Sequence, residues 1–257
     1  MRQYAFVGLG SFSMSMLERI AEVTDQIIAV DDDPARIEHI KEMVSTAFTI
    51  DLLDEEAFER VFHDPVDVAV VDIESNGAAI LLVTYRLKKL GVPEIIVKSN
   101  SEEYEDLLRL VGATRVVNSD LEAALRVTPL VLSSSLTNFM PISGDLVLAE
   151  VIAPSFVIDK TVVEVDLRRT HHVNVVAVKY AAERVANEVS EGVFHDLDAS
   201  YRFKQGDVLL VTGKESDVFV FSGVQKTAEQ EKKKTGFTML LKNMLGRKQR
   251  NRAKKDE

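Results

Sequence analysis

Short apolar runs alternate with helical patterns through the first half of the chain. The runs that predict strands are 4–7, 26–30, 47–50, 66–71, 94–97 and 115–117. Between them the spacing of apolar residues predicts helices near 12–23, 34–43, 54–62, 76–90 and 102–111. Several strands are apolar on consecutive positions, as expected when helices cover both faces of a sheet. This order predicts right-handed βαβ units and an α/β domain with a doubly wound, mostly parallel sheet.

A different pattern begins near residue 139. One more helix is predicted over 120–136, with a kink or a break at Pro129. After it, strands are predicted at 146–152, 162–165, 173–178, 185–189 and 207–211, turns at 206–207 and 212–213, and a helix at 214–221. We therefore expect an N-terminal domain over 1–138, a small α+β domain over 139–224 and a basic tail over 225–257.

The first strand runs directly into a glycine turn. Gly8 allows a tight turn, and Gly10 has no Cβ, so a pyrophosphate group could approach the backbone. The N–H groups that open the next helix, from Ser11, Phe12 and Ser13, would face the anion. Ser13 stands where a third glycine is usual and is small enough for close packing.

The second predicted strand closes on Asp31, about 20 residues after the glycine turn, where a carboxylate can accept hydrogen bonds from ribose hydroxyls. The strand, turn, helix and acid together indicate nucleotide binding in a Rossmann-like domain. The alternative is a domain of this type that has lost its ligand.

Composition and charge exclude several other kinds of site and several classes of protein. The absence of cysteine excludes disulfides, thiolate metal sites and cysteine catalysis. A strand that starts at residue 4 leaves no room for a signal peptide, and no apolar run is long enough to span a bilayer, so we expect a cytoplasmic protein. The net charge of −10 combines an acidic body with a basic tail, which argues against nucleic-acid binding by the body. The tail would be a solvated segment or a short amphipathic helix against a membrane or a partner.

Seven segments match one family in its order and spacing. They are FVGLG at 6–10, IAVD at 28–31, VK at 97–98, GATRVV at 112–117, VIAP at 151–154, NVVAVK at 174–179 and QGDVLLV at 205–211. On these segments the chain resembles KtrA and TrkA proteins, the cytosolic regulatory subunits of bacterial potassium uptake systems. Such proteins join an N-terminal RCK (regulator of potassium conductance) domain to a C-terminal RCK or TrkA-C domain. The resemblance covers residues 1–224 and not the tail.

The resemblance implies a ring of homodimers, octameric or tetrameric, at the inner face of the membrane beneath a KtrB- or TrkH-like potassium-translocating subunit. It also implies that ATP, ADP or NAD(H) binds the N-terminal domain and changes the shape of the ring. A ligand can gate in this way only through a difference in its affinity for two shapes. The implied function is regulatory, with no chemistry of its own.

The resemblance further implies roles for individual residues. Gly8 and Gly10 would form the phosphate turn and Asp31 the ribose anchor. The adenine side would be contacted from Asp51 and Leu52, the phosphates from Lys98, and the terminal phosphates and a bound Mg²⁺ or other cation from Asp120. For Lys98 and Asp120 a solvated side chain is the alternative.

One departure from the family concerns Ser11, which stands where such proteins often carry an arginine that reaches the terminal phosphate. The hydroxyl removes a charge-assisted contact of about 1.5–3 kcal/mol. Discrimination between ATP and ADP by that route is therefore not expected. NAD(H), ADP or AMP-type ligands become more plausible, and the alternative is a loss of nucleotide sensing.

The second domain resembles those that bind cyclic di-AMP across a dimer interface. On that resemblance Arg168 would stack on the dinucleotide, Asn174 would hydrogen-bond to it, and Val175 would pack against it. The alternative is that Val175 belongs to the core and that Arg168 is solvated.

Two other functional classes have weaker support from the sequence. An NAD(P)-dependent oxidoreductase would need a substrate domain with a general acid or base, and the second domain carries no evident catalytic constellation. A redox-sensing DNA-binding repressor would need a basic recognition helix, and none stands out in the body.

Overall fold

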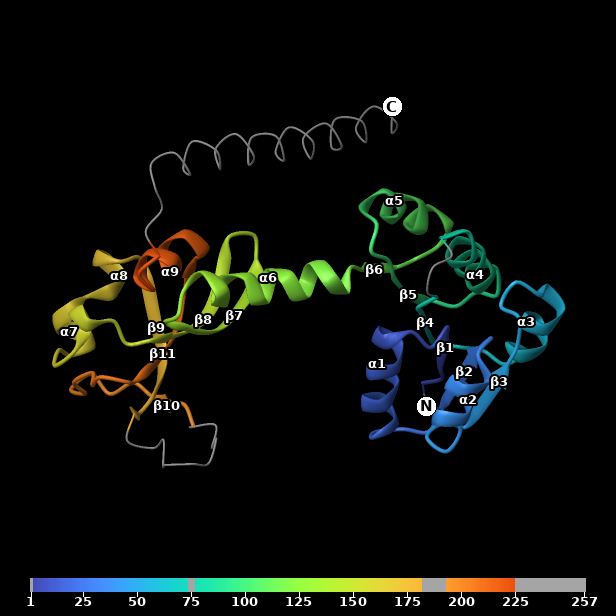
Figure 1. Cartoon of the computed structure of the whole chain (residues 1–257), viewed down its shortest axis with the longest axis horizontal. Helices are drawn as coiled ribbons and strands as arrows, with labels where there is room; N and C mark the ends of the chain where they lie inside the picture. Colours follow the sequence, from blue (N-terminus) through green and yellow to red (C-terminus); the bar gives the residue numbers. More distant parts are fainter. Residues whose placement is uncertain (1, 74–76, 182–192, 225–257) are drawn as a thin grey trace. The chain divides into compact units, whose positions relative to one another are not determined.

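The computed structural model describes residues 2–73, 77–181 and 193–224 (Figure 1). The chain divides into two compact units, Met1–Ala123 and Ala124–Glu257, and each is described by itself. The strand expected at 185–189 and the tail expected at 225–257 lie outside the described residues.

The first unit is built on a six-stranded sheet in the order β3-β2-β1-β4-β5-β6, with every pair of neighbours parallel. This confirms the predicted parallel sheet. The central strand β1 lies between β2 and β4, where the winding of the chain reverses, and ligands of open α/β sheets bind at such a point. The strands are β1 (Tyr4–Val7), β2 (Ile27–Asp31), β3 (Thr46–Thr49), β4 (Val68–Val71), β5 (Glu94–Lys98) and β6 (Arg115–Val117).

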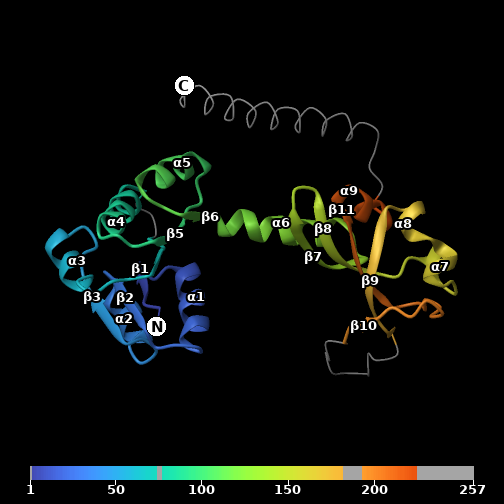
Figure 2. The same ribbon diagram turned by 180° about the vertical axis from the view of Figure 1, so that it is seen from behind.

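Helices cover both faces of this sheet (Figures 1 and 2). Adjacent residues of β1 point to opposite faces, so Phe6 packs in one core with Leu17 of α1, and Val7 in the other with Phe58 of α3 and Val83 of α4. Two buried layers on one sheet confirm the doubly wound prediction. The helices are α1 (Ser11–Ala21), α2 (Pro34–Ile40), α3 (Glu55–Val61), α4 (Gly77–Lys89) and α5 (Glu102–Val111).

Local signals place the starts of two short helices. Asp33 caps α2 by accepting a hydrogen bond from the Ala35 N–H at 2.8 Å, and Pro34 occupies the first helical position. Asp54 caps α3 by accepting from the Ala57 N–H at 3.1 Å. These residues explain why both helices begin at the carboxyl edge of the sheet.

The second unit holds an antiparallel sheet in the order β10-β9-β11-β8-β7. Its core gathers Phe139, Val151, Phe203, Leu209 and Phe219, which confirms the predicted small α+β fold. The elements are β7 (Leu136–Ser143), β8 (Leu146–Ile152), η1 (Ser155–Val157), α7 (Val162–Val165), α8 (Leu167–Thr170), β9 (Val173–Lys179), β10 (His195–Asp196), β11 (Val208–Lys214) and α9 (Glu215–Phe221).

The predicted helix over 120–136 differs from α6 (Ser119–Leu132) at its C-terminal end. Of the two outcomes predicted at Pro129, the break does not occur, because the helix continues to Leu132 and the Ser133 N–H donates to the Pro129 carbonyl at 3.1 Å; the kink stays a prediction. Residues Leu136–Ser143 then pair with β8 as a strand that the pattern did not indicate. The division between the two units falls inside α6, and residue 138, the expected boundary, lies within β7.

Two further predictions in the second unit are wrong. Residues 162–165 form helix α7, because Thr161 and Glu164 make a capping box whose two hydrogen bonds, at 2.8 and 3.2 Å, overcome the strand preference of the valines. Thr212 and Gly213 are not a turn but lie inside β11, opposite Leu148 and Val147 of β8.

Candidate functional site

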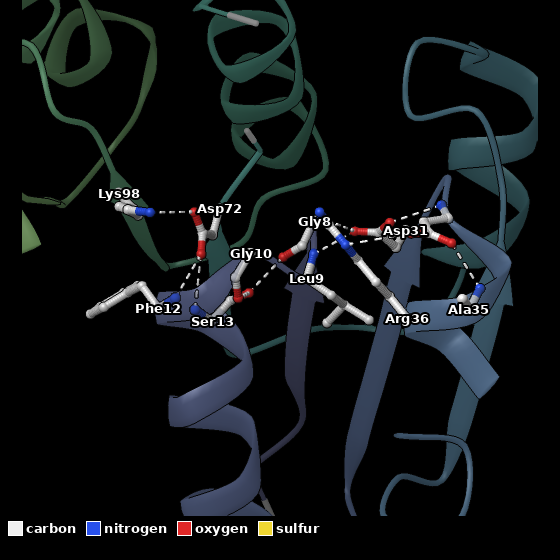
Figure 3. A network of polar contacts seen from close by, with 11 residues as sticks. Gly8, Leu9, Gly10, Phe12, Ser13, Asp31, Ala35, Arg36, Asp72 and Lys98 are labelled. Carbon is white, nitrogen blue, oxygen red and sulfur yellow. Dashed lines mark hydrogen bonds and ion pairs between the residues drawn. The ribbon is translucent and has the colours of Figure 1, made fainter. Parts of the chain in front are cut away.

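The carboxyl ends of β1, β2, β4 and β5 meet at one edge of the first sheet, and the candidate site lies there (Figure 3). The glycine turn leaves β1 and opens α1. Gly8 has a φ of 80°, and its N–H donates to the Val30 carbonyl of β2 at 2.8 Å. A Cβ at Gly8 would lie 2.4 Å from the carbonyl oxygen of Asp72, so only glycine fits at this position.

Asp72, the residue that follows β4, faces the start of α1. Its side chain is 2% exposed, and its Oδ2 accepts hydrogen bonds from the backbone N–H groups of Phe12 at 3.1 Å and Ser13 at 3.0 Å. A Cβ at Gly10 would lie 2.4–2.6 Å from the atoms of this carboxylate. The space that glycine leaves open at position 10 is therefore filled by a side chain of the protein itself.

Ser13 fastens the glycine turn from inside. It is fully buried, and its hydroxyl donates to the carbonyl oxygens of Gly8 at 2.8 Å and Gly10 at 3.1 Å. A glycine at this position would pack as closely but would leave these carbonyls without that donor. Ser11, in the same turn, is exposed and its carbonyl accepts a hydrogen bond from the Ser15 hydroxyl.

Asp31 holds the turn from the side of β2. It is 2% exposed, and its two oxygens accept from the backbone N–H groups of Leu9 at 2.5 Å and Asp33 at 2.8 Å. The Arg36 guanidinium lies 3.7 Å from the same carboxylate. Both oxygens of the expected ribose anchor therefore already have backbone donors.

Lys98 joins this network from the end of β5. Its Nζ lies 3.3 Å from Oδ1 of Asp72, and its side chain is 15% exposed. Lys98 and Asp72 both line a cavity of about 550 Å³, together with Gly77, Ser99 and Tyr104. This volume lies within the range of small-molecule sites, about 300–1,000 Å³.

Asp51 and Leu52 lie in the loop after β3, just past Ile50, whose N–H donates to the Asp31 carbonyl at 3.0 Å. Asp51 is exposed and its carboxylate accepts from the Leu53 N–H at 2.8 Å, whereas Leu52 is buried. Asp120 is exposed in the first turn of α6. Within the described residues, no group of three or more acidic or histidine side chains is arranged to hold a metal ion, so a cation at Asp120 stays a prediction.

The three residues predicted for cyclic di-AMP lie in the second unit. Arg168 is exposed on α8, and Asn174 is exposed on β9. Val175 is half-buried and packs against the core of that unit. Their role in binding stays a prediction.

Sequence reasoning missed Asp72 and Arg86. A signal for Asp72 was present in the sequence. An aspartate directly follows the apolar run 68–71, just as Asp31 directly follows the apolar run 27–30. Arg86 lies three residues after Val83 on the buried side of α4 and is 9% exposed. Its guanidinium donates to the carbonyl oxygens of Leu52 and Leu53 at 2.9 and 2.8 Å, which holds the loop after β3.

The contacts at α1 decide how well the edge fits a nucleotide. A phosphate group would need the N–H groups that open α1, and those of Phe12 and Ser13 are bonded to Asp72. A second negative group beside this carboxylate would be repelled. In this arrangement the α1 end of the site does not fit a phosphate group, although the cavity beside Lys98 has the volume for a ligand.

None of the helices in the described parts of the chain has both the length and the apolar character needed to cross a bilayer.

Comparison with known proteins gives the following matches. The TrkA-N domain family matches residues 4–119. Ktr system potassium uptake protein C of Bacillus subtilis (strain 168) is 27% identical over 220 residues, which cover 86% of this chain and 96% of that protein. Ktr system potassium uptake protein A of Vibrio alginolyticus is 24% identical over 212 residues, which cover 82% and 92% respectively.

Among solved structures, the GsuK RCK domain matches with a TM-score of 0.58 and 14% identity over 88% of this chain and 48% of that one. The GsuK channel bound to NAD matches with a TM-score of 0.54 and 15% identity over 88% and 40%. The chain thus spans about half the length of these GsuK chains or less, and the likeness shows the fold. The chain thus carries a TrkA-N domain at residues 4–119 and is similar, through both units, to Ktr system potassium uptake proteins.

Proposed function

We propose that this chain is a nucleotide-binding regulatory subunit that controls potassium flux through a membrane partner. The observation that carries the proposal is the match to the Bacillus subtilis Ktr protein C, which runs through both units and covers 96% of that protein. In this proposal residues 1–138 form the domain that senses the nucleotide. Residues 139–224 form a second regulatory domain, and the basic tail follows over 225–257.

The proposed ligand of the first domain is an adenine nucleotide, namely ADP, ATP or NAD(H). Three observations support it: the glycine turn at the switch point of the sheet, the cavity beside Lys98, and the likeness of the fold to the GsuK channel that was solved with NAD. The exposed Ser11 offers no charge to a terminal phosphate, which favours ADP or NAD(H) over ATP. A cation at Asp120 and cyclic di-AMP at Arg168, Asn174 and Val175 would be additional ligands.

The proposed partner is a KtrB- or TrkH-like potassium-translocating subunit, bound from the cytoplasmic side by a ring of homodimers. A nucleotide would act by binding one shape of the ring more tightly than another. A tenfold difference in affinity per site corresponds to about 1.4 kcal/mol, and several sites in one ring would multiply the bias.

In this proposal the chain catalyses no reaction. The rival proposal, an NAD(P)-dependent oxidoreductase, would require hydride transfer between the cofactor and a substrate. Incubation of the full chain with NADH and a panel of carbonyl compounds would reveal such transfer as a fall in the absorbance of NADH. A steady absorbance is the result expected here.

The decisive experiment is reconstitution of the full chain with the potassium-translocating subunit of the same organism. The two proteins should copurify in detergent, and adding ADP, ATP or NADH should change potassium uptake into liposomes that contain both. Liposomes with the translocating subunit alone are the control and should not respond to nucleotide. Failure to copurify, or uptake that no nucleotide changes, would contradict the proposed function.

A further inference from the structure

We propose that Asp72 is an internal occupant of the phosphate position, so that a nucleotide binds the first domain only by displacing this carboxylate from the start of α1. The inference rests on the proposed nucleotide site and concerns its regulation. It makes Asp72 the residue that sets how tightly the site takes a phosphorylated ligand.

The contacts of Asp72 are those that a bound phosphate would make. Its Oδ2 accepts from the N–H groups of Phe12 and Ser13, and the space beside Gly10 is filled by the same carboxylate. The first turn of α1 contains no acidic residue, so Asp72 supplies the negative group that faces the positive end of this helix. A phosphate and the carboxylate cannot both hold these donors.

The backbone of Asp72 is tied in place, whereas its side chain alone reaches α1. Its N–H donates to the Val7 carbonyl at 3.0 Å, and its carbonyl accepts from the Gly10 N–H at 3.3 Å. Rotation of the side chain would therefore free the α1 donors without separating β4 from β1. The exchange needs a movement of one carboxylate and not of the sheet.

Lys98 connects the carboxylate to the cavity from which a ligand would arrive. Its Nζ pairs with Oδ1 of Asp72 at 3.3 Å, and both residues line the cavity of about 550 Å³. An incoming phosphate that attracts Lys98 would weaken the ion pair between Lys98 and Asp72. The phosphate would then replace the Asp72 carboxylate as the acceptor of the N–H groups at the start of α1. Because the ligand-free arrangement is favoured, the apparent affinity would be lowered by the fraction of molecules in which Asp72 is displaced.

The test is calorimetric binding of ADP and of NADH to the full chain and to the variants Asp72→Asn and Asp72→Ala, with EDTA present so that no divalent cation bridges two anions. Asp67→Asn is the matched control. Asp67 lies just before β4, at the opposite end of that strand, and also accepts a backbone hydrogen bond, from the Gln3 N–H at 2.8 Å. Thermal unfolding of each protein is measured in parallel.

We expect both Asp72 variants to bind at least about tenfold more tightly than the wild type, within the usual range of coupling effects, and Asp67→Asn to bind like the wild type. The same Asp72 variants should unfold at lower temperature, because the Phe12 and Ser13 N–H groups lose their negatively charged acceptor. A residue with a structural role only would lower the unfolding temperature without raising affinity.

Equal affinity in the wild type and the Asp72 variants would overturn the inference while leaving the nucleotide site intact. Absence of binding in every protein, Asp72→Ala included, would overturn both the inference and the proposed nucleotide binding. If Asp72→Ala does not fold, Asp72→Asn, which keeps the shape of the side chain, still decides between these outcomes.

Discussion

The carboxylate of Asp72 occupies the space in which a side chain at Gly10 would begin, 2.4 Å from the ideal Cβ position. The two residues are brought together because β1 and β4 are neighbours in the sheet, with Val7 opposite Val71. Gly10 itself has an ordinary backbone conformation, with φ −67° and ψ 173°. The requirement for glycine at this position therefore comes from contact with Asp72 and not from backbone strain.

This contact predicts that Gly10→Ala will destabilise the wild-type chain by about 2 kcal/mol, the usual cost of overpacking a tight site. In the Asp72→Ala background the added methyl group has room, so the same substitution should cost less than about 1 kcal/mol. Urea unfolding of the four proteins, followed by circular dichroism, measures the difference. An identical cost in both backgrounds would show that something other than Asp72 restricts position 10.

The buried guanidinium of Arg86 predicts a second effect. Arg86→Met removes the donors to the Leu52 and Leu53 carbonyls and should lower the free energy of unfolding by about 2–3 kcal/mol. Hydrogen exchange of the 50–54 segment should also become faster, because the loop is no longer held. Arg109→Met is the control, since Arg109 pairs with Glu105 on the exposed side of α5 and should change stability by less than about 1 kcal/mol.

If Arg86→Met and Arg109→Met have equal effects, the two hydrogen bonds to the loop after β3 do not stabilise the fold.

In the second unit, Tyr201 donates a hydrogen bond of 2.8 Å to the fully buried carboxylate of Asp207. Burial, followed by this hydrogen bond, raises the pKa of the Tyr201 phenol above its ordinary value. The folded state thus favours the protonated phenol, whereas the unfolded chain ionises at about pH 10. The stabilisation is complete below about pH 10 and is lost as the pH rises above it.

Tyr201→Phe should therefore lower the free energy of unfolding by about 1.5 kcal/mol at pH 8, and the difference from wild type should shrink at pH 11. Urea midpoints at the two pH values measure it. Tyr85→Phe, at an exposed tyrosine of α4, should leave stability unchanged at pH 8. A difference between wild type and Tyr201→Phe that stays constant up to pH 11 would contradict the linkage.

The capping box of α7 gives a prediction in acid. The backbone N–H of Thr161, and next the Arg202 guanidinium, lower the pKa of the Glu164 carboxyl. Its stabilising effect is therefore present above the unfolded pKa of about 4.3 and is lost as the pH falls below it. Glu164→Gln should be less stable than wild type at pH 7, and the two should converge near pH 3.

Thermal unfolding of both proteins at pH 7 and pH 3 checks this expectation. Glu105→Gln, in the exposed pair with Arg109 on α5, controls for the loss of one surface charge. A Glu164→Gln variant as stable as wild type at pH 7 would mean that the negative charge of Glu164 adds nothing to the stability of the short helix, since glutamine can still accept from the Thr161 N–H.

The capping box also explains one failure of the sequence analysis. A run of four apolar residues at 162–165 fits a strand or a helix equally well by periodicity. Thr161 and Glu164 stand three residues apart, the spacing of a capping box, so the deciding signal was local and was overlooked. By contrast, nothing local to 136–143 distinguishes β7, because that segment is a strand through its pairing with β8.

The alternation of strands and helices in the first unit, the glycine turn after β1 and the acid at the end of β2 could be predicted from the sequence, because each depends on residues that are neighbours in the chain. What occupies the glycine turn could not be predicted, because it depends on how the strands are arranged in the fold. Asp72 meets Phe12 and Ser13 across 60 and 59 positions of the chain. Such a contact depends on which strands become neighbours, so a local pattern cannot contain it.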